Sequence, residues 1–205
     1  MTQFAVFSGS PSRVIRSPDF SSSVMIFFAV LLAFFIPTAA SEFGHHHEHL
    51  RALARIRSAD GKIKGQIEFV QQFKRGAPTH IFGNFSGLSE GAHGIGIMDY
   101  GNMLKGCESL GLEFNPDQMR HRVGKGVAGH RVGALGNVRD GEYNDKFNQQ
   151  VSLFGRNSVL GRGIVIFENE DDGSGKADAS QSLRNGNVGR PIACGIIGRM
   201  GGNFA

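Results

Sequence analysis

Residues 83–116 read GNFSGLSEGAHGIGIMDYGNMLKGCESLGLEFNP, and this stretch decides the fold. Its short apolar run, Gly94–Met98, is typical of a β-strand. A segment that is too long for a hairpin turn, Asn102–Gly133, follows the run, and a second one, Glu170–Pro191, lies further along the chain. Because long segments without regular structure in a compact domain are usually functional or disordered, both are candidates for a functional site.

The sequence on either side of this stretch has the pattern of β structure. Lys62–Phe69 alternates strictly between polar and apolar residues, which marks a half-buried strand. Asp60-Gly61 predicts a hairpin between that strand and residues 52–58, ALARIRS. The other short apolar or alternating runs are Thr79–Phe85, Gly94–Met98, Gln150–Phe154, Gly163–Phe167 and Ile192–Ile197. No amphipathic helix is expected after residue 40, and 30 glycines among many short strands predict an all-β sandwich or Greek-key barrel.

The first 40 residues are predicted to be a secretory signal peptide. Val24–Ile36 is uncharged and apolar, follows two arginines and precedes small residues up to Ala40. Its 13 residues are too few to span a bilayer, and the alternative is a buried helix. Because the leader before Met25 is long, a second hypothesis places the true start there. We therefore expect a secreted protein with no membrane attachment once the signal peptide is removed.

The chain has two cysteines, Cys107 and Cys194. Extracellular environments are oxidising, so secretion would make these two residues disulfide partners. A bridge that closes so long a loop would stabilise the fold by on the order of 4 kcal/mol in loop-entropy terms.

The polar residues give two further expectations. The formal net charge of +4 is modest and the basic residues are not clustered, so we expect no nucleic-acid partner. Asn84-Phe85-Ser86 is an N-glycosylation sequon, and Asn84 is a candidate site if its side chain faces outward from its strand.

A histidine-rich tail, residues 41–52, is expected between the signal peptide and the globular domain, residues 53–205. Its imidazoles belong to His45, His46, His47 and His49. Such tracts can hold zinc or copper(II), but a tail without fixed geometry would form only a weak site. The alternative is a solvated tail that binds no metal.

Residues 53–198 resemble the copper/zinc superoxide dismutase family. The segments that carry the resemblance are GLSEGAHG (87–94), GCESLGLEFNP (106–116), LGNV (135–138), NSVLGRGIVIFENEDD (157–172) and GNVGRPIACGIIG (186–198). The resemblance implies an eight-stranded Greek-key β-barrel with two long loops, often dimeric. It also implies a disulfide between Cys107 and Cys194.

The residues that would bind copper in this family are replaced. The resemblance places the four copper ligands, which are histidines in the family, at Gly96, Met98, Glu113 and Phe167. Glycine and phenylalanine offer no donor atom, and a methionine thioether suits copper(I) but supports copper(II) poorly. The resemblance therefore predicts no copper in the barrel.

The zinc positions are partly kept. His121 matches one ligand, and the next falls at Arg131, or at His130 if one residue is inserted. The aspartate ligand falls at Ala134, and Asp171 matches the carboxylate that links the two metal sites. An irregular zinc site made of Glu113, His121, His130 and Asp171 is one hypothesis. The alternative is a pair of exposed loop histidines.

The arginine that guides the substrate in the family is displaced: its position holds Pro191, and Arg190 lies one residue earlier. The leading hypothesis is a secreted pseudoenzyme without dismutase activity. It would act as a binding or structural protein, as a homodimer or as a heterodimer with an active superoxide dismutase. The alternatives are metal binding through the tail or the residual loop site, and a superoxide dismutase with an atypical metal site.

Overall fold

The computed structural model describes residues 49–121, 130–173 and 179–201 of the 205-residue chain. The predicted signal peptide and tail residues 41–48, which include His45, His46 and His47, lie outside the described residues. The strands are β1 (His49–Arg57), β2 (Lys64–Gln72), β3 (Thr79–Ser86), β4 (Ala92–Ile97), β5 (Leu104–Cys107), β6 (Ala134–Arg139), β7 (Glu142–Asn148), β8 (Gly163–Phe167), β9 (Pro191–Ile196) and β10 (Gly198–Arg199). The described residues also contain a 3₁₀ turn, η1 (Glu108–Leu110), and a short helix, α2 (Ala179–Asn185).

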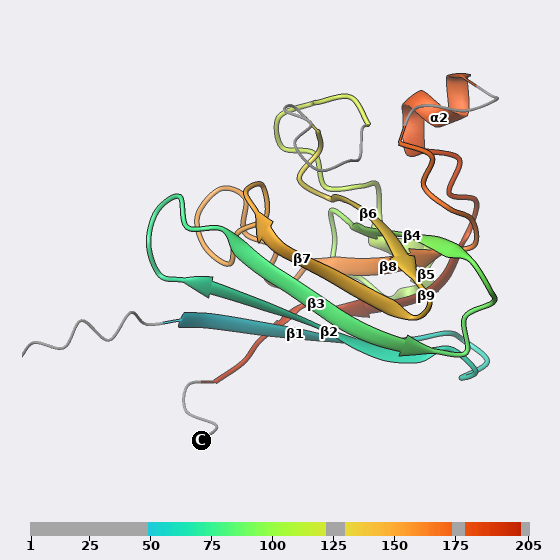
Figure 1. Ribbon diagram of the computed structural model, residues 1–205, viewed down its shortest axis with the longest axis horizontal. Helices are drawn as coiled ribbons and strands as arrows, with labels where there is room; N and C mark the ends of the chain where they lie inside the picture. The colour runs from blue at the N-terminus through green and yellow to red at the C-terminus, as the bar shows by residue number, and fades with distance from the viewer. Residues whose placement is uncertain (1–48, 122–129, 174–178, 202–205) are drawn as a thin grey trace, which may run out of the picture. The chain divides into compact units, whose positions relative to one another are not determined.

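The strands form a closed antiparallel barrel. The hydrogen-bonded order is β1-β2-β3-β7-β6-β4-β8-β9, and a pairing of Arg57 with Cys194 joins β9 back to β1. β10 continues along the same edge of β1 as β9, opposite the edge that pairs with β2. The connections from β3 to β4 and from β7 to β8 each pass over two strands of the barrel, which is Greek-key topology. The prediction of an all-β, eight-stranded Greek-key barrel is confirmed (Figure 1).

Alternation along the strands builds the core. In β2, Ile67 and Phe69 are fully buried, whereas Lys64 and Gln66, which precede them, are exposed. Their inward side chains join one cluster of buried residues from the barrel strands. Each fully buried isoleucine or phenylalanine contributes about 1.5–3 kcal/mol relative to exposure, so this cluster is the main source of the barrel's stability.

Aspartate-glycine turns set the register of two hairpins. Between β1 and β2, the Asp60 carboxylate accepts hydrogen bonds from the Lys62 amide (3.1 Å) and the Ser58 hydroxyl (2.6 Å), and Gly61 has φ +73°. This hairpin is confirmed. A second turn, Asp140-Gly141, joins β6 to β7, with φ values of +50° and +74° that suit a tight hairpin.

Four of the five short apolar or alternating runs lie in strands, β3, β4, β8 and β9, and the fifth does not. Gln150–Phe154 forms only an isolated bridge, Ser152 with Ser158. Side chains take the hydrogen bonds that a neighbouring strand would otherwise receive: the Asn148 side-chain oxygen, Oδ1, accepts from the backbone amide of Val151 at 2.8 Å. The expectation of a strand in this run was therefore wrong.

Two boundaries also differ from the expectation. β1 begins at His49, so the last four residues of the expected tail belong to the barrel, because Leu50 and Ala52 continue its inward-facing alternation. No amphipathic helix was expected, and the one α-helix among the described residues, α2, has only seven residues and lies within the long segment Glu170–Pro191. Within the described part of the chain, no helix has the length and apolar character needed to cross a membrane.

Asn84 is exposed on the outward face of β3, the orientation that its glycosylation sequon requires. Glycosylation at this residue stays a prediction.

The disulfide between Cys107 and Cys194 is confirmed, with their Cα atoms 5.6 Å apart. It ties the end of β5 to β9 across a sequence separation of 87 residues. Buried Met98, Leu110 and Val165 pack around it as a small apolar cluster. The bridge therefore fixes the loop that follows β4 against the barrel wall.

Replacing Cys107 with serine should lower the unfolding free energy by on the order of 4 kcal/mol and the Tm by on the order of 10 °C, because the long loop regains its entropy when the chain unfolds. Thermal unfolding of this variant measures the loss, and the Cys107→Ser/Cys194→Ser double variant controls for the thiol left behind. Iodoacetamide labelling of the denatured, unreduced wild-type protein would contradict the pairing.

Candidate functional site

Three of the positions that the resemblance assigns to copper meet at the end of β4. A Cβ atom on Gly96 would lie 3.7 Å from the Glu113 Oε1 atom and 3.7 Å from the Phe167 ring. Met98 joins them through a backbone bridge to Glu113. Its own side chain is 92% shielded and packs in the apolar cluster around the disulfide. The sequence-predicted positions therefore converge, but they place a phenyl ring and a glycine beside a single carboxylate.

Beside this group, four charged side chains form a continuous chain. The Arg131 Nη1 atom donates to Glu113 Oε2 at 2.8 Å, and His121 Nδ1 lies 3.0 Å from the same oxygen. On its other side, His121 Nε2 lies 3.0 Å from both carboxylate oxygens of Asp171. We call Arg131, Glu113, His121 and Asp171 the charge network. It is largely shielded from water, since the side chains of His121 and Asp171 are 2% and 4% exposed.

The two carboxylates keep His121 protonated. Burial alone would lower the pKa of its imidazole, but the hydrogen bonds and charges of Asp171 and Glu113 outweigh burial and raise the pKa from 6.5 to about 9. Both ring nitrogens then donate, one to each carboxylate. At neutral pH two cations, Arg131 and His121, balance two anions, Glu113 and Asp171.

Arg131 also joins segments that are distant in sequence. Its Nε atom donates to the Met119 carbonyl at 3.1 Å, and its Nη1 atom donates to the Arg184 carbonyl at 2.9 Å. Arg184 lies in the last turn of α2, where carbonyl groups have no partner within the helix. The planar guanidinium, with five donors in a fixed fork, therefore connects the loop before β6, the Glu113 segment and α2. Figure 1 shows this loop and α2 on the same side of the barrel.

The backbone positions Asp171 tightly. Its amide donates to the Asn137 side chain at 2.8 Å, and the Asn137 amide group donates back to the Asp171 carbonyl at 2.9 Å. Gly186, with φ +71°, closes over the network: a Cβ there would lie 2.1 Å from Asp171 Oδ1 and 2.6 Å from His121 Nε2. Only glycine fits at this position.

The residual zinc set is brought together only in part. Glu113, His121 and Asp171 are in contact, but His130 hydrogen-bonds through Nδ1 to the Arg131 carbonyl at 2.9 Å and is not part of the network. Ala134, opposite Gly96 in the sheet, supplies no donor. Over residues 49–121, 130–173 and 179–201, no group of three or more histidine, cysteine or acidic side chains is arranged to hold a metal.

In this arrangement the donors are engaged with one another: Arg131 holds Glu113 Oε2, and both nitrogens of His121 lie within hydrogen-bond distance of carboxylates. A protonated imidazole has no free lone pair on either nitrogen, so a metal would have to displace a proton from His121. It would also have to displace the guanidinium of Arg131 from Glu113 Oε2. His49, from the tail set, lies at the start of β1 with an exposed side chain.

The residue that sequence reasoning missed is Arg131. From the sequence alone, Arg131 is only the position of a lost zinc ligand, because an arginine cannot bind a metal. The sequence signal that could have revealed its role is charge: a carboxylate at Glu113 and a cation at Arg131 both stand where the family has imidazoles.

Arg190 pairs with Glu168 at the surface, Nε to Oε2 at 3.2 Å, with 76% of its side chain exposed.

His121 should make stability depend on pH. Its folded pKa of about 9 lies above the ordinary value of 6.5, so its contribution is complete below pH 6.5 and is lost as pH rises through about 9. The loss should be on the order of 3 kcal/mol. Denaturant unfolding between pH 6 and 9.5 measures it, with His121→Gln as the control in which this slope disappears. Equal slopes in both proteins would contradict the assignment.

Replacing Arg131 with leucine should destabilise the fold by about 2–3 kcal/mol, because Glu113 keeps its charge in a shielded site without its cation. Arg139→Leu is the matched control: its pair with Glu170 is exposed and should be worth less than about 1 kcal/mol. Arg131→Lys should lie between, since lysine keeps the charge but not the fork. Equal unfolding free energies for the Arg131→Leu and Arg139→Leu variants would show that the charge network stabilises the fold no more than an exposed ion pair does.

Comparison with known proteins agrees with the barrel described above. A family model for copper/zinc superoxide dismutase matches residues 63–197. Cu-Zn superoxide dismutase A of Xenopus laevis is 38% identical over 146 residues, which cover 70% of this chain and 94% of the relative. Extracellular Cu-Zn superoxide dismutases of Drosophila melanogaster and Brugia pahangi are 36% and 39% identical over 150 and 161 residues, covering 70% and 71% of this chain and 80% and 74% of the relatives. The chain belongs to the copper/zinc superoxide dismutase family.

Proposed function

We propose that this chain is a secreted member of the family that no longer dismutates superoxide and acts by binding a partner. The observation that carries the proposal is the charge network, in which Arg131 and protonated His121 neutralise Glu113 and Asp171. Charged groups shielded from water are costly unless paired, and here every one of them is paired within the protein. The two positive and two negative charges of the network cancel, so the site needs no further ion to neutralise it.

Dismutation needs a group that takes one electron from superoxide and then gives one to a second superoxide. Protein side chains of the kinds present here do not cycle in this way, so a redox metal would have to supply the step. Of the four positions assigned to copper, only Glu113 offers an oxygen donor, and that carboxylate already accepts from His121 and Arg131. The Phe167 ring and the hydrogen atom of Gly96 add no ligand.

Secretion is supported by two independent lines. The sequence predicts a signal peptide ending near Ala40, and two of the relatives are named extracellular superoxide dismutases. The disulfide between Cys107 and Cys194 is consistent with an oxidising compartment.

The partner surface that we propose is residues 99–112, here called the disulfide loop. Its large exposed apolar side chains are Tyr100 (61%), Met103 (41%), Leu104 (91%) and Leu112 (78%). The loop is well held: the Tyr100 amide donates to the Leu110 carbonyl at 2.9 Å, and the Ser109 hydroxyl donates to the Asn102 carbonyl at 2.8 Å. A rigid loop that exposes several apolar groups is typical of an interaction site.

The partner that we propose is a chain of the same fold, either a second copy of this protein or an active family member. A pre-ordered loop loses little conformational entropy on binding, which favours association through a small apolar surface.

Metal loading and activity test the loss of dismutation. The purified mature protein, incubated with copper and zinc and then dialysed, should hold less than stoichiometric copper and should not accelerate superoxide loss. Elemental analysis and superoxide-driven cytochrome c reduction measure the two quantities, with the Xenopus relative treated in parallel as the positive control. Stoichiometric copper with catalytic superoxide removal would contradict the proposal. Metal that disappears on deletion of residues 41–48 would instead favour metal handling by the tail.

Substitution of Leu104 by glutamate should abolish association, since the most exposed apolar side chain of the disulfide loop would become charged. Sedimentation velocity of the protein alone, and mixed with an active relative, measures it. Leu183→Glu on α2 is the matched control, because Leu183 is also exposed (50%) but lies outside the loop. A monomer in both experiments, or association that survives Leu104→Glu, would contradict the proposed surface.

A further inference from the structure

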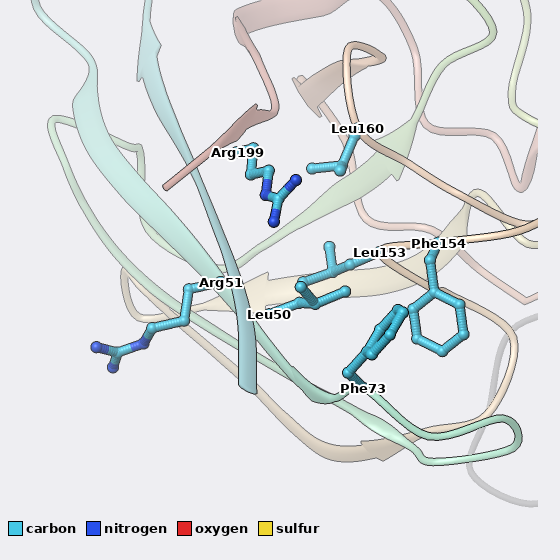
Figure 2. Close-up of a pocket in the computed structure, with 7 residues that line it drawn as sticks. All are labelled: Leu50, Arg51, Phe73, Leu153, Phe154, Leu160 and Arg199. Atoms are coloured by element: carbon cyan, nitrogen blue, oxygen red, sulfur yellow. The ribbon is translucent and has the colours of Figure 1, made fainter. Parts of the chain in front are cut away.

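A cavity of about 250 Å³ is lined by seven residues, none of which belongs to the charge network (Figure 2). It is bordered by the start of β1, the residue after β2, the segment between β7 and β8, and β10. Three leucines, Leu50, Leu153 and Leu160, supply aliphatic surface to it. Leu153, a residue of the buried core, forms part of the cavity lining.

Two aromatic rings form one wall of the cavity. Phe73 and Phe154 meet edge to face, with ring centroids 5.1 Å apart and an interplanar angle of 65°. Phe73 is nonetheless 61% exposed, so part of its ring faces solvent at the mouth. The wall therefore presents apolar surface that a ligand could cover.

Arg199 brings a positive charge to the same space. It pairs with Ala52 across the β10–β1 ladder, and Ala52 is fully buried on the inner face of β1. Residues directly opposite each other in an antiparallel pair share a face, so Arg199 lies on the side of Ala52 and of Leu50, two residues away. Figure 2 shows the Arg199 side chain extending toward the leucines, whereas Arg51 points away to the other side of β1.

No acidic side chain among the described residues pairs with the charge of Arg199. The cavity lining contains two arginines and no acidic residue. Among the described residues, the Arg199 guanidinium makes no hydrogen bond or ion pair. The cavity thus combines an apolar body with one cationic end, and it has no other charged or polar side chain than the arginines.

We propose that this cavity binds a small carboxylate with an unbranched aliphatic chain. The guanidinium fork matches a carboxylate in a bidentate geometry, and the leucine and phenylalanine surface offers nothing to a polar chain. At about 250 Å³ the cavity is somewhat below the range of roughly 300–1,000 Å³ for drug-sized ligands, so its occupant is a medium-chain acid.

Octanoate is the probe, titrated into the purified mature protein by isothermal calorimetry. Octanoate should bind at one site, and hexanoate should bind more weakly, by up to about fourfold for each methylene lost. Octan-1-ol, which has the same chain without the charge, should bind at least tenfold more weakly. Arg199→Gln should reduce octanoate affinity at least tenfold and leave octan-1-ol binding unchanged.

Arg55→Gln is the matched control, because Arg55 lies on the outer face of β1 and does not line the cavity. It should bind octanoate as the wild-type protein does, and thermal unfolding confirms that both variants are folded. The proposal is overturned if octanoate shows no saturable binding, if octanoate and octan-1-ol bind equally, or if both arginine variants weaken binding to the same extent. None of these outcomes bears on dismutase activity or on the disulfide loop.

Discussion

The interaction on which the rest of the site depends is the ion pair of Arg131 with Glu113. A carboxylate and an imidazolium that are shielded from water require opposite charges in contact, and the guanidinium supplies the last one. The same guanidinium holds the carbonyl of Arg184, so α2 is fixed by the electrostatics of the site. In this arrangement the protein itself provides the cationic cross-link between loops that a bound dication could otherwise provide.

Beside the charge network, apolar packing fills the other positions that the resemblance assigns to copper. Phe167 and Met98 extend the hydrophobic environment of the disulfide toward Gly96, so the end of β4 is filled by a ring and a thioether-bearing chain rather than by polar donors. One side of Glu113 therefore faces hydrocarbon and the other faces charge. This asymmetry explains why its Oε2 atom accepts both charged hydrogen bonds.

Most of the barrel could be predicted from the sequence, because strict alternation and the Asp60-Gly61 turn are local signals. β6 and β7 were missed, although Asp140-Gly141 carried the same turn chemistry, because β7 does not alternate cleanly: Phe147 is 73% exposed and the polar Asn148 is buried. Gln150–Phe154 misled because its hydrogen bonds go to side chains, which no local pattern reveals. At the site, the positions were predictable from the resemblance. The role of Arg131 was not, since it depends on which charges meet across 18 residues of sequence.

The close approach of Gly186 to Asp171 and His121 has a consequence for how this protein matures. A lid seated so tightly leaves no slot for a late-arriving ion, and the countercharge is encoded in the polypeptide. On the function proposed above, such a chain needs only folding and the oxidation of its cysteines, and no trace element, to reach its finished form.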